Sequence, residues 1–237
     1  MAFHYSPKIV TDGLEFYIDA ANPKSYTSGS TTEYDLVGTQ DMTLNNGVSY
    51  STDNLGTLEL DGIDDYLITD NIYDFFKPAM SFDIWFNRTQ SNNSYNMVWQ
   101  MYVPYLSFRT EGTFLFSRYT KLSGVTTQRN LYTTNTFSDN TWYNVVCTHF
   151  QDISTGDSIA NIYVNGELEE TETIPNSVDE VYYTTVTNRK LMLGAWNVTS
   201  PIYHFEGKIP SLKIYNKILS ADEVRQNFNA TKTRFGL

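Results

Sequence analysis

The stretch spanning residues 141–168 constrains the fold more than any other part of this sequence. Residues 141–150 (TWYNVVCTHF) mix β-branched and aromatic side chains with no helical spacing, which indicates a strand. Residues 159–164 are also rich in strand formers and end at Asn165-Gly166, a dipeptide suited to a tight turn with positive φ. The polar residues 151–158 separate the two runs. The sequence therefore predicts an antiparallel hairpin followed by a tight turn.

Strand-like runs also occur throughout the rest of the chain. Two of them, residues 57–60 and 66–69, flank a short acidic segment and are expected to form a hairpin. A third, residues 96–108, is expected to be one strand interrupted at Pro104. The remaining runs are residues 14–19, 42–44, 81–87, 112–118, an edge strand near Leu131, and residues 179–187, 191–196 and 211–215. About a dozen strands are typical of a two-sheet sandwich of jelly-roll type.

One helix is expected near the C-terminus. Ser220 and Glu223 form a capping-box pattern, and Leu219 and Val224 are placed as a hydrophobic staple. The spacing predicts a helix of about two turns over residues 221–228. We expect it to pack over the edge of the sandwich, because short helices need tertiary packing to persist.

The composition supports a single all-β domain. The chain has 237 residues, of which 41% are hydrophobic and 15% aromatic, enough apolar material to fill the space between two sheets. Sandwiches of this length fold as one domain, and neither a repeat nor a linker interrupts the pattern. We predict an all-β, two-sheet antiparallel jelly-roll sandwich with one short C-terminal helix. A single domain is expected to span residues 1–237, with short N- and C-terminal tails.

Five segments of the chain together resemble one known family. They are GLEFYIDAANPKSY at 13–26, LELDGIDDYLIT at 58–69, MSFDIWFN at 80–87, the central hairpin, and residues 205–237. Their order is similar to that of laminin-G-like, concanavalin A-like jelly-roll domains. The two end segments look most like the type found in bacteriophage virion structural proteins. The resemblance implies that other virion proteins, of the capsid or the tail, are partners. Self-association into a homo-oligomer is a further option.

The net charge of −11 argues against two classes of partner. Binding to phosphate depends on Lys and Arg, so neither nucleic acid nor an anionic membrane is expected as a partner. The sequence has no apolar run of about 18 residues and no signal-peptide pattern at its start. Its single cysteine fits a reducing compartment. We expect a protein that is made in the host cytoplasm without a signal peptide and is displayed on the virion surface.

Two groups of side chains suggest catalysis, and neither has a complete pattern. Glu167, Glu169 and Glu172 resemble the paired carboxylates of glucanases with this fold, but the central Asp of that motif is missing. Alternatively, these three glutamates simply lie on the solvent-exposed face of a strand. Cys147 and His149 would share one strand face, but no orienting acid accompanies them, and the alternative for Cys147 is burial as a small apolar residue. We predict no catalytic residue and a protein that is not an enzyme.

Three aspartates are candidates for a calcium site. Asp61, Asp64 and Asp65 lie in one short segment, and calcium prefers carboxylate oxygens. Many laminin-G-like domains hold calcium beside their loops, but the later strand that carries acids in the family pattern reads GKIPSL at 207–212 here. Turn formation is the alternative role, since Asp is a preferred turn residue. We expect no obligatory cofactor, with calcium as an open option.

Aromatic side chains near predicted loop edges are candidates for binding a host surface glycan. An aromatic ring can stack on the apolar face of a sugar. The candidates are Tyr105, Trp196 and Tyr203, with Tyr95, Tyr102 and His204 at similar positions.

Two functions fit these observations. The first is a non-enzymatic phage virion structural protein on the particle exterior, most readily head (capsid) decoration, because the heptads or repeats of a fibre stalk are missing. The alternative is a carbohydrate-binding tail-fibre or adhesin module that recognises host surface glycans. Apolar tail residues are candidates for partner binding, and packing on their own domain is their alternative role. These residues are Phe3, Tyr5, Phe235 and Leu237.

Overall fold

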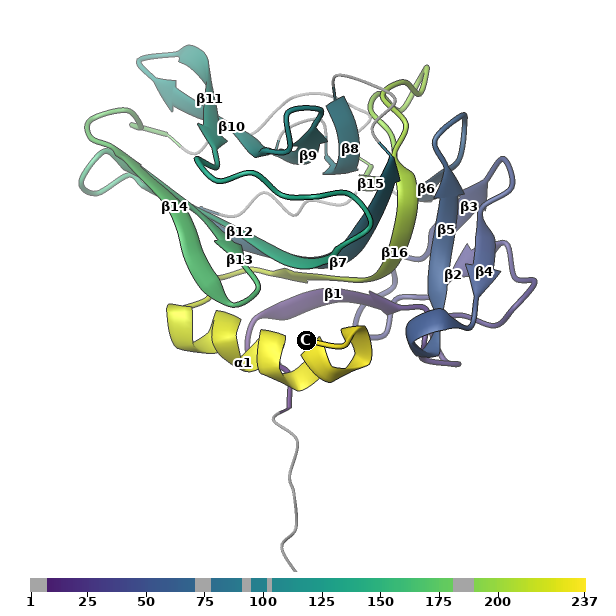
Figure 1. The fold of residues 1–237 in the computed structure, drawn as a ribbon. Coiled ribbons are helices and arrows are strands. Elements are labelled where there is room, and N and C mark those ends of the chain that lie inside the picture. Colours follow the sequence, from purple (N-terminus) through teal and green to yellow (C-terminus); the bar gives the residue numbers. More distant parts are fainter. Residues whose placement is uncertain (1–7, 71–77, 91–94, 102–103, 181–189) are drawn as a thin grey trace, which may run out of the picture.

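Two antiparallel β-sheets pack face to face in the computed structural model (Figure 1). The structure describes residues 8–70, 78–90, 95–101, 104–180 and 190–237. Within these residues, sheet A contains eight strands, in the order β14-β13-β12-β7-β16-β5-β4, with β1 also paired to β16. Sheet B contains eight strands in the order β11-β10-β9-β8-β15-β6-β3-β2. The predicted all-β, two-sheet antiparallel sandwich with one C-terminal helix is confirmed.

The strands of the two sheets range from two to twelve residues in length. Sheet A is built from β1 (Leu14–Asp19), β4 (Ser49–Ser51), β5 (Thr57–Asp61), β7 (Ala79–Gln90), β12 (Trp142–Asp152), β13 (Asp157–Val164), β14 (Glu167–Ile174) and β16 (Glu206–Tyr215). Sheet B is built from β2 (Thr32–Glu33), β3 (Met42–Asn45), β6 (Tyr66–Thr69), β8 (Tyr95–Gln100), β9 (Tyr105–Arg109), β10 (Phe114–Leu122), β11 (Val125–Tyr132) and β15 (Met192–Leu193).

The central hairpin forms as predicted. β12 and β13 pair antiparallel, with Val145 opposite Val164. Asn165 and Gly166 have φ values of 51° and 86° and make the tight turn into β14. The Asn165 side chain accepts a hydrogen bond of 3.0 Å from the backbone N–H of Asn144, which joins the turn to β12.

The acidic segment between β5 and β6 is not a hairpin, and the sequence prediction is wrong here. β5 pairs with β4 and β16 in sheet A, whereas β6 pairs with β3 and β15 in sheet B. Residues 61–65 therefore cross from one sheet to the other. Local patterning cannot show this, because each strand pairs with one strand that is distant in the sequence, β16 for β5 and β15 for β6.

Other strand predictions differ in detail. Residues 96–108 form two paired strands, β8 and β9, rather than one. Of residues 191–196, only β15 is a strand, and Trp196 makes an isolated bridge with Ile202. Most of the strand predicted at 179–187 lies outside the described residues. The edge strand expected near Leu131 is confirmed as β11, at the end of sheet B.

The main core fills the space between the two sheets. Sheet A contributes inward side chains such as Phe82, Val145 and Leu212, and sheet B contributes Trp99 and Phe116. The rings of Phe82 and Trp99 stack between the sheets with centroids 4.0 Å apart. Burial of such large apolar side chains is the main stabilising contribution to a fold of this kind.

Helix α1 (Ala221–Thr231) packs on the outer face of sheet A and is followed by the 3₁₀ turn η2 (Lys232–Phe235) (Figure 1). The predicted capping box is confirmed, because the side chains of Ser220 and Glu223 each accept a hydrogen bond from the other's backbone N–H. Val224 packs with Val146 of β12 in a second apolar cluster. The helix is longer than predicted and lies against the sheet face, not over the sandwich edge. No helix in the described part of the chain is long and apolar enough to cross a membrane.

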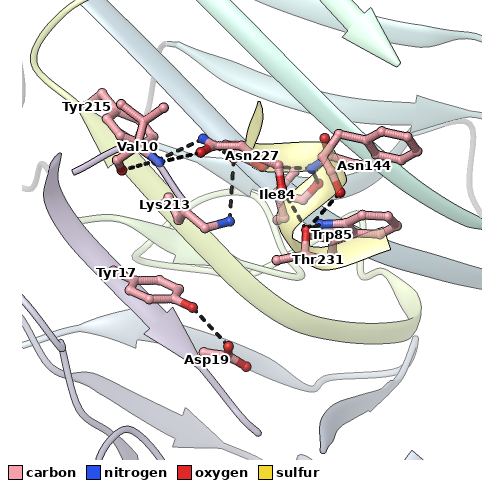
Figure 2. A network of polar contacts seen from close by, with 12 residues as sticks. Val10, Tyr17, Asp19, Ile84, Trp85, Asn144, Lys213, Tyr215, Asn227 and Thr231 are labelled. Atoms are coloured by element: carbon pink, nitrogen blue, oxygen red, sulfur yellow. Dashed lines mark hydrogen bonds and ion pairs between the residues drawn. The ribbon is translucent and has the colours of Figure 1, made fainter. Parts of the chain in front are cut away.

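A buried polar network joins this helix to the sheet (Figure 2). Asp83 on β7 and Lys213 on β16 lie opposite each other, and their side chains form an ion pair of 3.4 Å. Asn227 of α1 donates hydrogen bonds to Asp83 at 2.8 Å and to the Tyr215 hydroxyl at 2.9 Å, and Asn144 donates to Asp83 at 2.7 Å. Both faces of β7 are therefore buried.

Candidate functional site

A hollow of about 250 Å³ on sheet B is lined by Tyr95, Met97, Tyr105, Trp196 and Tyr203. These side chains come from β8, from the start of β9 and from the loop that follows β15. The structure thus brings together the glycan candidates Tyr105, Trp196 and Tyr203 with the further candidate Tyr95, and it adds Met97.

Strand alternation turns these side chains away from the main core. Leu106 and Phe108 of β9 belong to that core, so Tyr105 projects from the opposite face of the sheet. Met97 and Tyr105 belong to a separate small apolar cluster, against which Tyr95 and Trp196 pack. The hollow therefore lies on the outer face of sheet B.

Backbone hydrogen bonds close the loop between Trp196 and Tyr203. Trp196 and Ile202 exchange two of these bonds, at 2.7 and 2.9 Å. Tyr203 then adopts a φ of 57°, which is uncommon for a bulky residue, and its carbonyl accepts a hydrogen bond of 3.1 Å from the Met97 N–H. Left-handed conformations at such residues are concentrated at functional sites. Here the conformation sets the direction of the Tyr203 ring.

The four rings form two contacting pairs. The centroids of Tyr105 and Trp196 are 4.9 Å apart in an edge-to-face arrangement, and those of Tyr95 and Tyr203 are 5.4 Å apart. Tyr105 is only 9% exposed, Trp196 is half-buried, and Tyr203 is 39% exposed. The hollow thus has a buried aromatic floor and an accessible aromatic rim.

Polar groups border the hollow on the β9 to β11 side. The Gln128 amide nitrogen lies 3.3 Å from the Tyr105 hydroxyl. Burial raises the pKa of Tyr105, so this hydroxyl stays protonated at neutral pH. The Arg109 guanidinium lies 4.4 Å from the ring centroid of Tyr95 and pairs with Glu111 at 2.5 Å. Hydrogen-bond donors and acceptors are therefore available next to the rings.

This arrangement suits binding rather than catalysis. The five lining side chains include no carboxylate, imidazole or thiol, so they offer no acid and base pair. Apolar rings with a few polar groups are the usual composition of a small-ligand site. The volume of about 250 Å³ lies just below the range of about 300–1,000 Å³ typical of drug-sized ligands. One ring of a larger molecule would fit it.

A family model described as the concanavalin A-like lectin/glucanases superfamily, of the laminin-G type, matches residues 61–225. The chain belongs to this superfamily. The family resemblance inferred from sequence segments is thereby confirmed at the level of the domain. A search of curated proteins finds no match to the chain.

Solved structures share the lectin-like fold at low sequence identity. The receptor-binding domain of botulinum neurotoxin type G matches with a TM-score of 0.64 and 13% identity, over 92% of this chain and 51% of that one. The binding domain of botulinum neurotoxin DC in complex with SialylT gives 0.63 and 13%, over 94% and 52%. A Trypanosoma rangeli sialidase gives 0.65 and 12%, over 99% and 36%. The chain spans about half of these proteins or less, and the likeness establishes the fold alone.

The three aspartates of the predicted calcium site lie close together between β5 and β6. One carboxylate oxygen from each of Asp61, Asp64 and Asp65 lies within 4.8 Å of the others. Asp61 accepts a hydrogen bond from the N–H of Ile63 at 2.8 Å, and Asp65 accepts one from the N–H of Asp61 at 3.0 Å. Asp65 is buried, and this burial raises the pKa of its carboxyl. Two of the three carboxylates therefore stabilise the turn itself.

These aspartates meet only part of the requirement of a calcium ion. Calcium takes about six to eight oxygen ligands. The exposed Asp64 carboxylate and the buried Oδ1 of Asp65, which has no hydrogen-bond partner among the described residues, remain as possible ligands. Residues 207–212, which carry acids in the superfamily pattern, contain none here. Calcium binding at this lectin-like domain stays a prediction.

Cys147 and His149 lie inside the sandwich. Cys147 is fully buried in the main core, and burial raises the pKa of its thiol. Burial, together with the nearby Arg118, lowers the pKa of His149 to about 3. A protonated thiol beside a neutral imidazole is not a reactive thiolate. The role of Cys147 as a buried, small apolar residue is confirmed.

Each of the three glutamates on β14 has a different partner. The partners of Glu167, Glu169 and Glu172 are Arg225 at 3.3 Å, Asn135 at 2.6 Å and Arg118 at 2.5 Å, respectively. Glu172 pairs inward, whereas Glu167 is exposed. The solvated strand-face role fits the exposed Glu167 but not the inward-paired Glu172, and these separate partners offer no positive sign of a hydrolase.

The tails differ from the sequence expectation. Phe235 is 6% exposed and its ring packs on Trp85 and Trp142, so it packs on its own domain, which is the alternative role given for it, and is not an exposed partner contact. Leu237 is 48% exposed and remains a candidate contact. Phe3, Tyr5 and Tyr102 lie outside the described residues. His204 does not line the aromatic hollow, and its ring nitrogens lie near the carbonyls of Asp65 and Pro201.

Proposed function

We propose that this chain is a non-enzymatic carbohydrate-binding domain and that the aromatic hollow is its binding site. The observation that carries the proposal is the convergence of Tyr95, Tyr105, Trp196 and Tyr203 on the outer face of sheet B. These residues come from segments about a hundred positions apart, and the rim of their cluster stays accessible.

Sugar rings combine an apolar face of C–H groups with a periphery of hydroxyl groups. The exposed Tyr203 and half-buried Trp196 supply aromatic surface for the apolar face. The Tyr105 hydroxyl and the Gln128 amide, which lie 3.3 Å apart, supply polar partners at its edge. The Tyr203 ring packs against the Tyr95 ring at 5.4 Å, which limits its freedom before binding and so lowers the entropy cost of association.

Membership of a lectin and glucanase superfamily supports this proposal. One similar structure is a neurotoxin binding domain in complex with SialylT, and another is a sialidase in complex with a difluoro-nononic acid. Those ligands belong to those proteins, each of which is at least about twice the length matched here. They favour a glycan as the class of ligand and leave its identity to experiment.

Glycan-array screening followed by calorimetry with the best ligand tests the site. We expect Tyr203→Ala to weaken binding about tenfold or more, because stacking residues at the centre of a site commonly contribute over 1 kcal/mol. Tyr34→Ala is the matched control, since Tyr34 is an exposed tyrosine away from the hollow. Equal affinities for Tyr203→Ala and the wild type would place the glycan elsewhere, and no binding on the array would argue against the proposal.

We further propose that the domain is displayed on the exterior of a bacteriophage particle, as head decoration, with other virion proteins as partners. Sequence resemblance to virion structural proteins supports this location. The net charge of −11 also suits an outer surface that must not adhere to nucleic acid. The alternative location is a tail fibre or adhesin, where glycan recognition would serve host attachment.

Immunogold labelling or cryo-EM of purified particles tests the location independently of glycan binding. Many copies over the head would support decoration, and a few copies at the tail tip would favour the fibre alternative. Absence from particles would exclude both locations and leave the carbohydrate-binding proposal unaffected.

A further inference from the structure

We propose that the open end of the sandwich, between β11 and β14, binds an oxyanion. A hollow of about 330 Å³ lies there and is distinct from the aromatic hollow. It is lined by Val125, Thr127 and Arg129 of β11 and by Ile174 and Pro175 at the end of β14. This inference does not depend on the proposed glycan site.

Arg129 lies beside a second arginine. In the antiparallel pair of β10 and β11, Arg129 is directly opposite Arg118. Leu131, the next residue on the same side of β11, belongs to the main core, so both arginines project inward between the sheets. Opposed residues of this kind have Cβ atoms about 4.5–5.5 Å apart, and like charges at such positions repel each other.

The described residues supply too little negative charge for this pair. Glu172 pairs with Arg118 at 2.5 Å. Arg129 donates to the Thr120 hydroxyl at 3.3 Å, and no carboxylate in the described part of the chain lies within ion-pairing distance of it. His149, which faces Arg118 from sheet A, is neutral at pH 7. The two arginines and Glu172 therefore leave one positive charge at this end of the sandwich, on the partly buried Arg129.

Two carboxylates, Asp179 and Glu180, lie at the rim of the hollow, outside ion-pairing distance of Arg129. Asp179 lies near the β10–β11 turn, where it accepts a hydrogen bond of 2.6 Å from the Ser123 N–H. Lys121 and Glu180 form their own pair of 2.8 Å. These contacts fix the turn at the mouth of the hollow.

Arg118 provides an independent sign of a missing acceptor. Its side chain is fully buried, and its Nε and Nη1 atoms have no hydrogen-bond partner among the described residues. A buried charged donor without an acceptor is costly to stability. A carboxylate, sulfate or phosphate group presents several oxygens in the geometry that guanidinium groups bind best. Arg129 lines the hollow, whereas Arg118 lies opposite it on β10 and does not. An oxyanion in the hollow would therefore pair directly with Arg129 and would also be attracted by the charge of Arg118.

Titration of the full chain with phosphate, sulfate and glucuronate, each against chloride at equal ionic strength, tests the proposal. We expect saturable binding that weakens about tenfold or more in Arg129→Gln, which keeps hydrogen-bond donors but removes the charge. Arg225→Gln is the matched control, because Arg225 is an exposed arginine on α1, with Glu167 and Asp222 as its partners. Arg118 is left unchanged, because substitution of a fully buried arginine risks unfolding the protein.

Each outcome decides the question. Binding of phosphate or sulfate alone would support a site for a free oxyanion, and tighter binding of glucuronate would support the charged group of an acidic sugar. No saturable binding to the folded wild type, or equal binding by Arg129→Gln, would overturn the proposal. A crystal grown with phosphate that shows only ordered water against the two guanidinium groups would overturn it as well.

Discussion

The ring of Phe235 stacks on the indole of Trp85, with centroids 4.1 Å apart and planes 21° apart. Trp142 packs against Phe235 at 4.7 Å, and the Trp85 indole N–H donates a hydrogen bond of 3.0 Å to the Thr231 hydroxyl. The residues after the helix therefore attach to β7 and β12, the two strands at the middle of sheet A (Figure 2 shows Trp85 and Thr231).

Phe235→Ala should lower the free energy of unfolding by about 3 kcal/mol, because it removes a buried ring from between two tryptophans. Urea unfolding followed by circular dichroism measures the change. Leu237→Ala is the control, since Leu237 is 48% exposed and should change stability by less than about 0.5 kcal/mol. Equal effects of the two substitutions would mean that this stacking contributes little.

The contact between Phe235 and Trp85 illustrates which part of the fold could be predicted from the sequence and which part could not. The capping box at Ser220 and the turn at Asn165-Gly166 depend on neighbouring residues, and both are confirmed. Alternation along β7 correctly groups Asp83 with Trp85 on one face. It cannot reveal what covers that face, because the covering helix lies more than a hundred residues away. The same limit made Phe235 resemble an exposed contact.

The aromatic hollow could be predicted only in part for a similar reason. Tyr105, Trp196 and Tyr203 stood out as aromatic residues near loop edges. Met97 and the bordering Gln128 did not, because their positions depend on the register of β8 with β9 and of β10 with β11. The register of β8 with β9 shifts between Met97 and Trp99, and no local pattern shows such an irregularity.

Lys213→Met should destabilise the protein by about 3–5 kcal/mol, because it leaves the Asp83 carboxylate buried without its counter-ion. The double variant Asp83→Leu/Lys213→Met should recover much of this loss, since no unpaired charge remains. Denaturant titration of all three proteins gives the coupling energy. Arg225→Gln, which breaks an exposed pair, should cost less than about 1 kcal/mol. A similarly small effect of Lys213→Met would show that solvent reaches the network.

Gly166→Ala should destabilise the protein more than Gly124→Ala. Both glycines have left-handed backbone, with φ values of 86° and 76°, so each substitution costs about 1–2 kcal/mol from the conformation alone. A Cβ at Gly166 would also lie 3.0 Å from the ring of Phe228 on α1, whereas nothing lies within 4 Å at Gly124. Thermal unfolding of the two variants isolates this contact. Equal melting temperatures would mean that the helix moves away at no cost.

His149 should make stability depend on pH below neutrality. Its pKa is about 3 when folded and 6.5 when unfolded, because burial and Arg118 disfavour the imidazolium. The unfolded state therefore binds the proton more readily, and stability is lost as pH falls from 6.5 toward 3. Between pH 7 and pH 4 the loss should be about 3 kcal/mol. The difference in unfolding free energy between wild type and His149→Gln at several pH values measures it, and a constant difference would contradict this assignment.

Variants of the acidic segment, residues 61–65, can distinguish a role in turn formation from a role in calcium binding. Because Asp61 and Asp65 accept hydrogen bonds within the turn, we expect EDTA to leave the melting temperature unchanged. Asp61→Ala should cost about 1 kcal/mol, whereas Asp61→Asn, which keeps an oxygen acceptor, should cost less. Asp64→Asn is the deciding variant, because its exposed carboxylate would serve a calcium ion but is not needed by the turn. A melting temperature that rises with millimolar calcium in the wild type, and not in Asp64→Asn, would establish a calcium site instead.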